Sequence, residues 1–175
     1  MIGRLVVAVA LSLAGAAVAG AAEGAGSASG EARVNGKPIA LAHAYLFHAP
    51  DNWNEKEINS IVLITPRPLD EAKLRGASTL VEAIAVADEH VAVEVRATGG
   101  QADLRICHPE FGEGRCYSTT ISKPEWSPAE AAEGHVAGSV RTFTGREEEI
   151  FQGDYRLFYE FRFDAVPVRD FDRRK

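Results

Sequence analysis

Residues that form recognisable catalytic or metal-binding motifs are scarce in this chain. Two cysteines are present among 175 residues, and the five histidines show neither the HxH nor the HExxH spacing of metal sites. No serine stands in a GxSxG sequence, and no glycine-rich segment has the spacing and the lysine of a phosphate-binding loop. These absences do not exclude an enzyme, but they favour a protein without a catalytic site, and no cofactor is expected.

Positive charge is also in short supply. The chain has 19 lysines and arginines against 25 aspartates and glutamates, a formal net charge of −6. Binding to a nucleic-acid backbone needs a clustered positive surface, so nucleic acid is not an expected partner. The basic residues near the C-terminus, in the sequence RDFDRRK, are interrupted by Asp170 and Asp172. We interpret residues 169–175 as a solvated charged tail.

Long apolar runs are absent except near the N-terminus. Residues 5–13 are almost uninterruptedly apolar, they follow the positive charge of Arg4, and residues 17–19 form an A-x-A match. Residues 1–19 therefore have the pattern of a secretory signal peptide, with cleavage expected between residues 19 and 22. Because the run is shorter than the roughly 20 residues of a membrane span, the mature chain is expected in the periplasm or the medium, with no transmembrane span.

The composition after the signal peptide predicts a short linker and one domain. Residues 20–30 are small and poor in apolar side chains, which predicts a flexible linker. Residues 31–168 are close to the most common size of a single domain and suffice for one core. Removal of the signal peptide also removes Arg4 and brings the formal charge to −7.

The first part of this domain has the pattern of β-strands. Asn35-Gly36 is a strong hairpin signal that follows a short extended segment at 31–34. The next run, to Phe47, is apolar or small on both faces, so this strand should be well covered. Residues 58–65 form a third apolar strand, closed by prolines that cannot donate to a ladder.

The middle of the domain has helical signals. Residues 69–75 carry acids early, basic residues late and a following glycine, which suits one or two helical turns. Thr79 and Glu82 then fit a capping box for a second short helix over 79–87. A strand over residues 80–86 remains an alternative, because short apolar runs are ambiguous.

The second half returns to period-two alternation. Residues 91–96 and 104–106 predict a hairpin around Gly99-Gly100, and strands are expected over 115–121 and 134–143, separated by a proline-broken loop. The last strand has the clearest pattern, with one core face formed by Leu157, Tyr159, Phe161 and Phe163. The expected fold is mainly β: an antiparallel β-sandwich or barrel-like fold of about 7–8 strands with one or two short helices in the middle.

Three segments carry a resemblance to known proteins: VNGKPIALAHAYLF, IVLITPRPLD and YRLFYEFRFDAVPV. In these three segments the chain resembles a loose group of uncharacterised exported bacterial proteins that are mainly β. The resemblance covers most of the mature chain and rests on apolar alternation and turn residues. It implies a fold and an exported location, and it carries over no catalytic or binding residue.

The segment CHPEFGEGRC contains both cysteines of the chain. In an oxidising compartment a pair that can approach is usually joined, so Cys107 and Cys116 are expected to form a structural disulfide. Closing this loop should contribute about 2.5–3 kcal/mol in the chain-entropy model. A redox motif would place two residues between the thiols, whereas eight stand here. His108 is expected to be a lone solvent-facing histidine. The side chains of this loop form a candidate binding site: His108, Glu110, Glu113 and Arg115.

Two classes of function remain open from the sequence. The first is an exported non-catalytic module that binds an unknown protein, glycan or envelope component through its loops. The second is a small enzyme or an apolar-ligand carrier with a cavity between sheets or inside a barrel. Within the first class, an acidic chain that presents a disulfide-closed loop could also inhibit a basic secreted enzyme.

Overall fold

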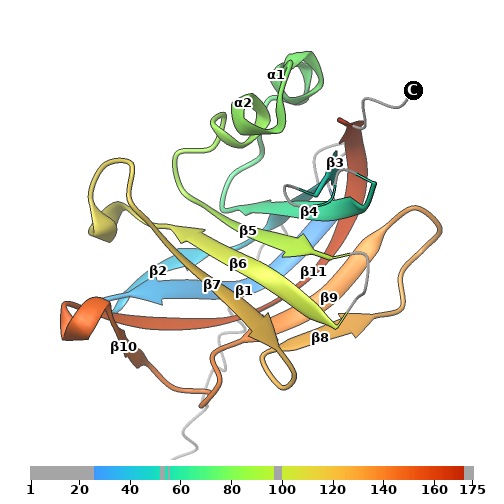
Figure 1. Ribbon diagram of the computed structural model, residues 1–175. Coiled ribbons are helices and arrows are strands. Elements are labelled where there is room, and N and C mark those ends of the chain that lie inside the picture. Colours follow the sequence, from blue (N-terminus) through green and yellow to red (C-terminus); the bar gives the residue numbers. More distant parts are fainter. Residues whose placement is uncertain (1–25, 52–53, 55, 97–99, 172–175) are drawn as a thin grey trace, which may run out of the picture.

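The chain folds into one strongly curved, nearly barrel-shaped antiparallel sheet with two short helices packed on its outside (Figure 1). The computed structural model describes residues 26–51, 54, 56–96 and 100–171. The strands within this part are β1 (Gly26–Val34), β2 (Lys37–Ala40), β3 (His43–Pro50), β4 (Ile58–Thr65), β5 (His90–Val95), β6 (Gln101–Cys107), β7 (Cys116–Ser122), β8 (Trp126–Ala129), β9 (Val136–Arg141), β10 (Glu148–Ile150) and β11 (Tyr155–Asp170). The helices are α1 (Glu71–Gly76) and α2 (Leu80–Ile84), and the 3₁₀ turns are η1 (Pro109–Phe111) and η2 (Phe151–Gly153).

The hydrogen-bonded order of the sheet is β7-β6-β5-β4-β3-β1-β11-β9-β8. β2 pairs with β1, β10 pairs with β11, and the far end of β11 pairs with β3 in parallel. The two strands at the ends of this order, β7 and β8, follow each other in the sequence, but no strand pairing joins them. We call the place where the sheet is not closed, between β7 and the strands β8 and β10, the seam.

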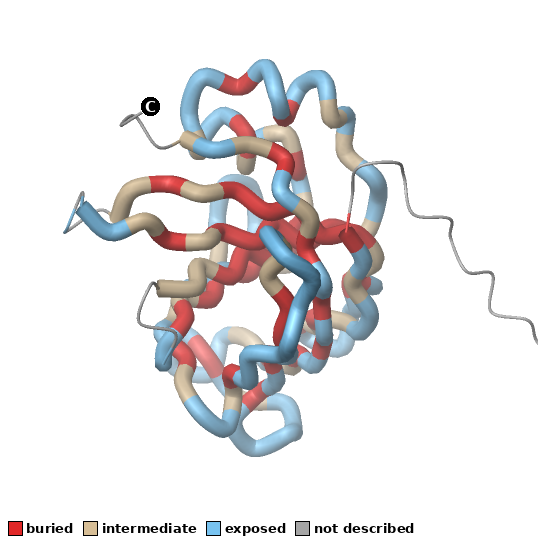
Figure 2. The backbone as a smooth tube through the Cα atoms, turned by 90° about the vertical axis from the view of Figure 1, so that its right-hand side faces the viewer, coloured by how far each residue is buried: buried red, intermediate tan, exposed pale blue. Residues whose placement is uncertain are grey.

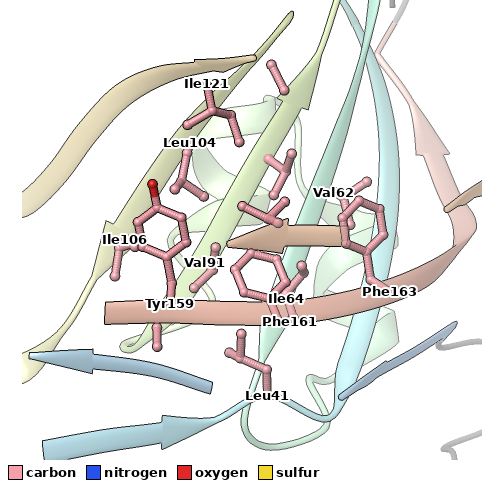
Figure 3. Packing of buried hydrophobic residues seen from close by; sticks show 14 of the residues in the cluster. Leu41, Val62, Ile64, Val91, Leu104, Ile106, Ile121, Tyr159, Phe161 and Phe163 are labelled. Carbon is pink, nitrogen blue, oxygen red and sulfur yellow. The ribbon is translucent and has the colours of Figure 1, made fainter. Parts of the chain in front are cut away.

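The inside of the curved sheet is a packed apolar core. On β11 the predicted alternation is confirmed, because Leu157, Tyr159, Phe161 and Phe163 are buried whereas their neighbours Arg156, Glu160, Arg162 and Asp164 are exposed. The inward side chains of β4, β5 and β6 meet them, as Figure 3 shows for Val62, Val91 and Leu104. Side chains, rather than an open interior, fill the space between these strands.

A second apolar cluster lies between the helices and the outer face of β3 and β4. Tyr45, Phe47 and Leu63 point away from the main core and pack with Leu74 of α1 and Ala83 of α2. Both faces of β3 are therefore buried, as its sequence predicts. Buried residues follow the strands in Figure 2, whereas the connecting loops are largely exposed.

Both helices begin at side-chain caps, of which the sequence predicts Thr79 for α2 but not Asp70 for α1. The side chain of Asp70 accepts hydrogen bonds from the first turn of α1. The Thr79 hydroxyl accepts from the Glu82 N–H, and the Glu82 carboxylate accepts from the Ser78 N–H. These bonds satisfy N–H groups that have no partner inside a helix. The alternative of a strand over residues 80–86 is wrong.

The N-terminal linker is shorter than its composition predicts. Residues 26–30, which we expected in the flexible linker 20–30, form the first half of β1. Residues 27–30 pair with β11, and Gly26 pairs with Ala44 of β3. Gly26 and Gly30 serve close packing there, since a side chain at either position would overlap the backbone of β11. The predicted signal peptide and cleavage site lie outside the described residues.

Several strand boundaries also differ from prediction. The run to Phe47 is divided into β2 and β3, Trp126–Ala129 in the expected proline-broken loop forms β8, and β10 lies where no strand was expected. The sheet therefore has 11 strands in the described part, rather than 7–8. β11 continues to Asp170, so residues 169–170 belong to the sheet and not to a charged tail. Strands of three or four residues are too short to show the alternation of apolar and polar residues by which a strand is recognised in the sequence.

Candidate functional site

The predicted disulfide joins directly opposed residues at one end of β6 and β7. Cys107 and Cys116 are partners in the strand register, and their Cα atoms are 4.3 Å apart. This separation suits the closely spaced type of antiparallel pair. The bond closes residues 108–115 into a loop beside the first residues of β7, and the prediction is confirmed.

Two of the predicted site residues anchor this loop instead of lining a site. His108 is 6% exposed, so the expectation of a solvent-facing histidine is wrong. Its Nε2–H donates to the Lys37 carbonyl at 3.0 Å, and its Nδ1 accepts from the Glu110 N–H at 3.0 Å. Burial lowers the pKa of His108, which agrees with the neutral ring that this pair of bonds requires. The Glu110 carboxylate lies 2.6 Å from Lys37 Nζ, so the side chains of His108 and Glu110 both fasten the loop to Lys37, the first residue of β2.

The other two predicted residues remain exposed, and one of them lines a groove. Glu113 is exposed at the tip of the loop. Arg115 lines a groove of about 700 Å³ between the disulfide loop and the η2 turn. Both segments lie at the same end of the sheet, on the left in Figure 1. The lining residues are Arg105, Phe111, Gly114, Arg115, Cys116, Ser118, Phe151, Asp154 and Tyr155.

Aromatic rings form one wall of this groove. Phe111 packs edge-on against Tyr155 with ring centroids 5.1 Å apart, and Phe151 lies 5.8 Å from each of these two rings. Phe111 is buried, whereas Phe151 is 49% exposed. Neighbouring rings therefore hold a large apolar side chain in place while about half of its surface faces solvent.

The backbone that presents Phe151 is in an unusual conformation. Phe151, Gln152 and Gly153 have φ angles of 50°, 61° and 96°, which form three consecutive left-handed residues. This region is unfavourable by about 1–2 kcal/mol for a residue with a Cβ, and such conformations cluster at functional sites. The fold thus tolerates a local cost that keeps the Phe151 ring at the mouth of the groove.

The charge of the groove is opposite to that of the chain. Two arginines and one carboxylate line it: Arg105, Arg115 and Asp154. The Arg105 guanidinium lies on the outer face of β6, with Nη2 3.6 Å from Cys116 Sγ. A positively charged groove in a chain of net charge −6 favours an anionic ligand at this end.

No family model, curated protein or solved structure matches this chain.

The sequence pointed to this end of the molecule through the disulfide, but it missed the residues that define the groove. Phe151 and Asp154 lie in the turn between β10 and β11, and Arg105 lies on β6. The available signal was an apolar Ile150-Phe151 pair followed by the turn-forming sequence QGD. Nothing in the sequence reveals that this turn meets the disulfide loop.

The other notable features form weaker sites. A hollow of about 1050 Å³ lies over the outer face of β1, β11, β9 and β8 and carries charges of both signs, which is typical of a solvated sheet face. Within the described ranges no group of three histidine, cysteine or acidic side chains could hold a metal ion. No helix of the described residues is long and apolar enough to cross a membrane.

One polar pair lies close to the seam. The Tyr159 hydroxyl donates to Glu125 Oε1 at 3.3 Å, and burial raises the pKa of both groups. The pair connects β11 with the turn between β7 and β8. The neutral phenol donates a hydrogen bond to the carboxyl group, and we assign the pair a structural role.

Proposed function

We propose that this protein is an exported, non-catalytic β module that binds an acidic protein partner through the groove between the disulfide loop and the η2 turn. The observation that carries the proposal is the exposed ring of Phe151, which is held on a left-handed backbone next to Arg105 and Arg115. Aromatic and arginine side chains dominate the binding energy of protein interfaces. Here they lie together at one end of the sheet.

The exported location is supported by the sequence and by the disulfide. The N-terminal residues have the pattern of a signal peptide. The Cys107–Cys116 bond is of a kind that forms and persists mainly in oxidising compartments. The resemblance to exported β-rich proteins agrees with both observations.

The alternative functions have less support. An apolar-ligand carrier needs an interior cavity, whereas side chains such as Phe161 and Leu104 pack across the inside of the sheet (Figure 3). An inhibitor of a basic enzyme needs an acidic docking surface, whereas the groove carries Arg105 and Arg115. A glycan could stack on the exposed ring, but the two arginines favour an acidic partner.

Affinity capture with groove variants tests this proposal. The mature protein would capture partners from an envelope fraction, and each partner identified would be purified and titrated against the variants Phe151→Ser and Arg115→Glu. Val81→Ser is the matched control, because Val81 is 77% exposed but lies on α2, away from the groove.

We expect both groove variants to weaken binding by at least about tenfold, a loss of roughly 1.4 kcal/mol, and Val81→Ser to leave it unchanged. The affinity should also fall with added salt, because the arginines attract an acidic surface. Equal binding by all three variants, or a partner whose binding surface is basic, would overturn the proposal.

A further inference from the structure

One edge of the sheet, on β7, has no strand partner. β7 is seven residues long and pairs with β6 in an unbroken register from Cys116 to Ser122. On its other side no strand of the described residues pairs with it, and β8 at the opposite end of the sheet does not close the seam. Alternate N–H and C=O groups of β7 therefore point away from the sheet without a ladder partner.

β7 lacks the devices that usually protect an edge. Proteins blunt exposed edges with proline, with lysine, with bulges or with a covering segment. β7 has the sequence CYSTTIS, which contains neither proline nor a charged residue, and its register with β6 shows no bulge. Ser118 and Thr120 are exposed on its outer face. A regular, uncharged edge of this kind favours pairing with another strand.

This free edge leads directly into the groove. Cys116 and Ser118 of β7 line the groove together with Phe151 and Arg115. The Phe151 ring also contacts Tyr117 at the start of β7, with centroids 5.9 Å apart. A strand added along residues 118–121 would therefore end against the Phe151 ring, and its outward side chains would lie next to the arginines.

A second copy of this chain is a poor occupant of the edge. In an antiparallel pair of two β7 strands centred on Thr119, all seven residues pair, and Arg115 of one copy lies opposite Lys123 of the other. Like charges directly opposite each other destabilise a strand pair. An acidic segment would meet the same cations favourably.

We propose that the partner adds an extended acidic segment as a further strand on the free edge of β7, with the end of that segment in the groove. This inference rests on the proposed function and names its recognition mode. Main-chain hydrogen bonds to β7 supply affinity, while Arg105, Arg115 and Phe151 select side chains.

A synthetic peptide of four Glu-Val repeats, labelled with fluorescein, serves as the probe with the mature protein. A peptide of four Lys-Val repeats is the charge control. Two further Glu-Val peptides carry N-methyl groups on all the valines or on all the glutamates, so that each lacks the N–H groups of one edge. We expect the Glu-Val peptide to bind and the Lys-Val peptide not to bind. The edge of the peptide that faces β7 needs its N–H groups, so at least one methylated peptide should bind about tenfold or more weakly.

Amide exchange locates the added strand. At a saturating concentration of the Glu-Val peptide, the β7 N–H groups that do not bond to β6 should exchange more slowly, because they gain ladder partners. If Phe151→Ser weakens binding while both methylated peptides bind normally and β7 exchange is unchanged, strand addition is wrong and the groove function stands.

Two other results would also overturn strand addition. One is the absence of binding by the Glu-Val peptide at about 1 mM. That result would not affect the proposed function, which is tested separately by titrating the partner against the groove variants. The other is a dimer in sedimentation experiments whose β7 amides are protected without any peptide, which would assign the edge to a second copy.

Discussion

The ring of Phe151 meets the ring of Tyr117 edge-on, with centroids 5.9 Å apart and planes at 84°. Phe151 belongs to the η2 turn before β11, and Tyr117 is the second residue of β7. The contact therefore crosses the seam and joins two parts of the sheet that no strand pairing connects there. It places the exposed half of Phe151 beside the free edge and beside the disulfide loop.

The strained backbone at Phe151 gives a prediction that separates binding from stability. Glycine adopts a positive φ without steric cost, so Phe151→Gly should recover about 1 kcal/mol of strain while it loses the ring contacts. We expect the free energy of unfolding to change by less than about 1 kcal/mol and partner binding to be lost. Chemical denaturation measures the first quantity and titration the second.

Phe111→Ala is the comparison for this variant. Phe111 faces the same groove but is only 2% exposed, so its truncation should cost about 3–5 kcal/mol. A similar large loss for Phe151→Gly would show that the Phe151 ring is mainly a structural plug, and would contradict its role as a binding residue.

The disulfide should stabilise the protein and position the groove, without taking part in chemistry. Replacing Cys107 and Cys116 together with serine should lower the free energy of unfolding by up to about 3 kcal/mol. Partner binding should weaken, because Arg115 and Phe111 are presented by the loop that the bond closes. A thiol assay on protein purified without reductant should find no free thiol, and two free thiols would contradict the bond.

The residues that the sequence predicted well are those whose signal is local. The capping box at Thr79 and Glu82 and the alternation around Phe161 depend on neighbours within a few residues, so both could be identified before any fold was known. The disulfide followed from having one possible pair of cysteines. The loop was thus recognised as a site candidate, although only Arg115 of its four proposed residues lines the groove.

The features that the sequence did not predict depend on tertiary contacts. Gly26 and Gly30 lie in a segment with the composition of a linker. Only the close approach of β11 explains why this strand requires glycine at both positions. Phe151 is a large apolar residue next to the buried Ile150, yet it is 49% exposed on a left-handed backbone. His108 is polar and lies in a loop, yet it is buried and bonds to the carbonyl of Lys37 in β2.

The core face of β11 gives a direct test of the packing. Phe161 is 3% exposed and packs with the inward side chains of the sheet (Figure 3), so Phe161→Ala should lower the free energy of unfolding by about 3–5 kcal/mol. Phe143→Ala is the matched control, since Phe143 is 63% exposed. Urea denaturation of both variants should show a large difference. A loss below about 1 kcal/mol for Phe161→Ala would mean that the face assignment is wrong.

Three buried histidines predict how stability depends on pH. Burial lowers the pKa of His43, His90 and His108 from the ordinary value of 6.5. Below pH 6.5 the unfolded chain therefore binds more protons than the folded chain, and stability falls as the solution is acidified. Their contribution is fully present above pH 6.5 and is lost as the pH falls towards the lowered values. Glu125 acts in the opposite direction, because burial raises its pKa above 4.5.

Urea denaturation between pH 7.5 and 5 checks this expectation, with the free energy of unfolding plotted against pH. Each histidine that stays neutral in the folded state can contribute a slope of up to about 1.4 kcal/mol per pH unit. His108→Gln should reduce the slope, because glutamine does not titrate, while the loss of the Nδ1 acceptor for the Glu110 N–H lowers the stability at pH 7.5. If the slope of His108→Gln equals that of the wild type, the His108 ring accepts a proton as readily in the folded protein as in the unfolded chain. The anchoring of the disulfide loop by a neutral His108 would then be wrong.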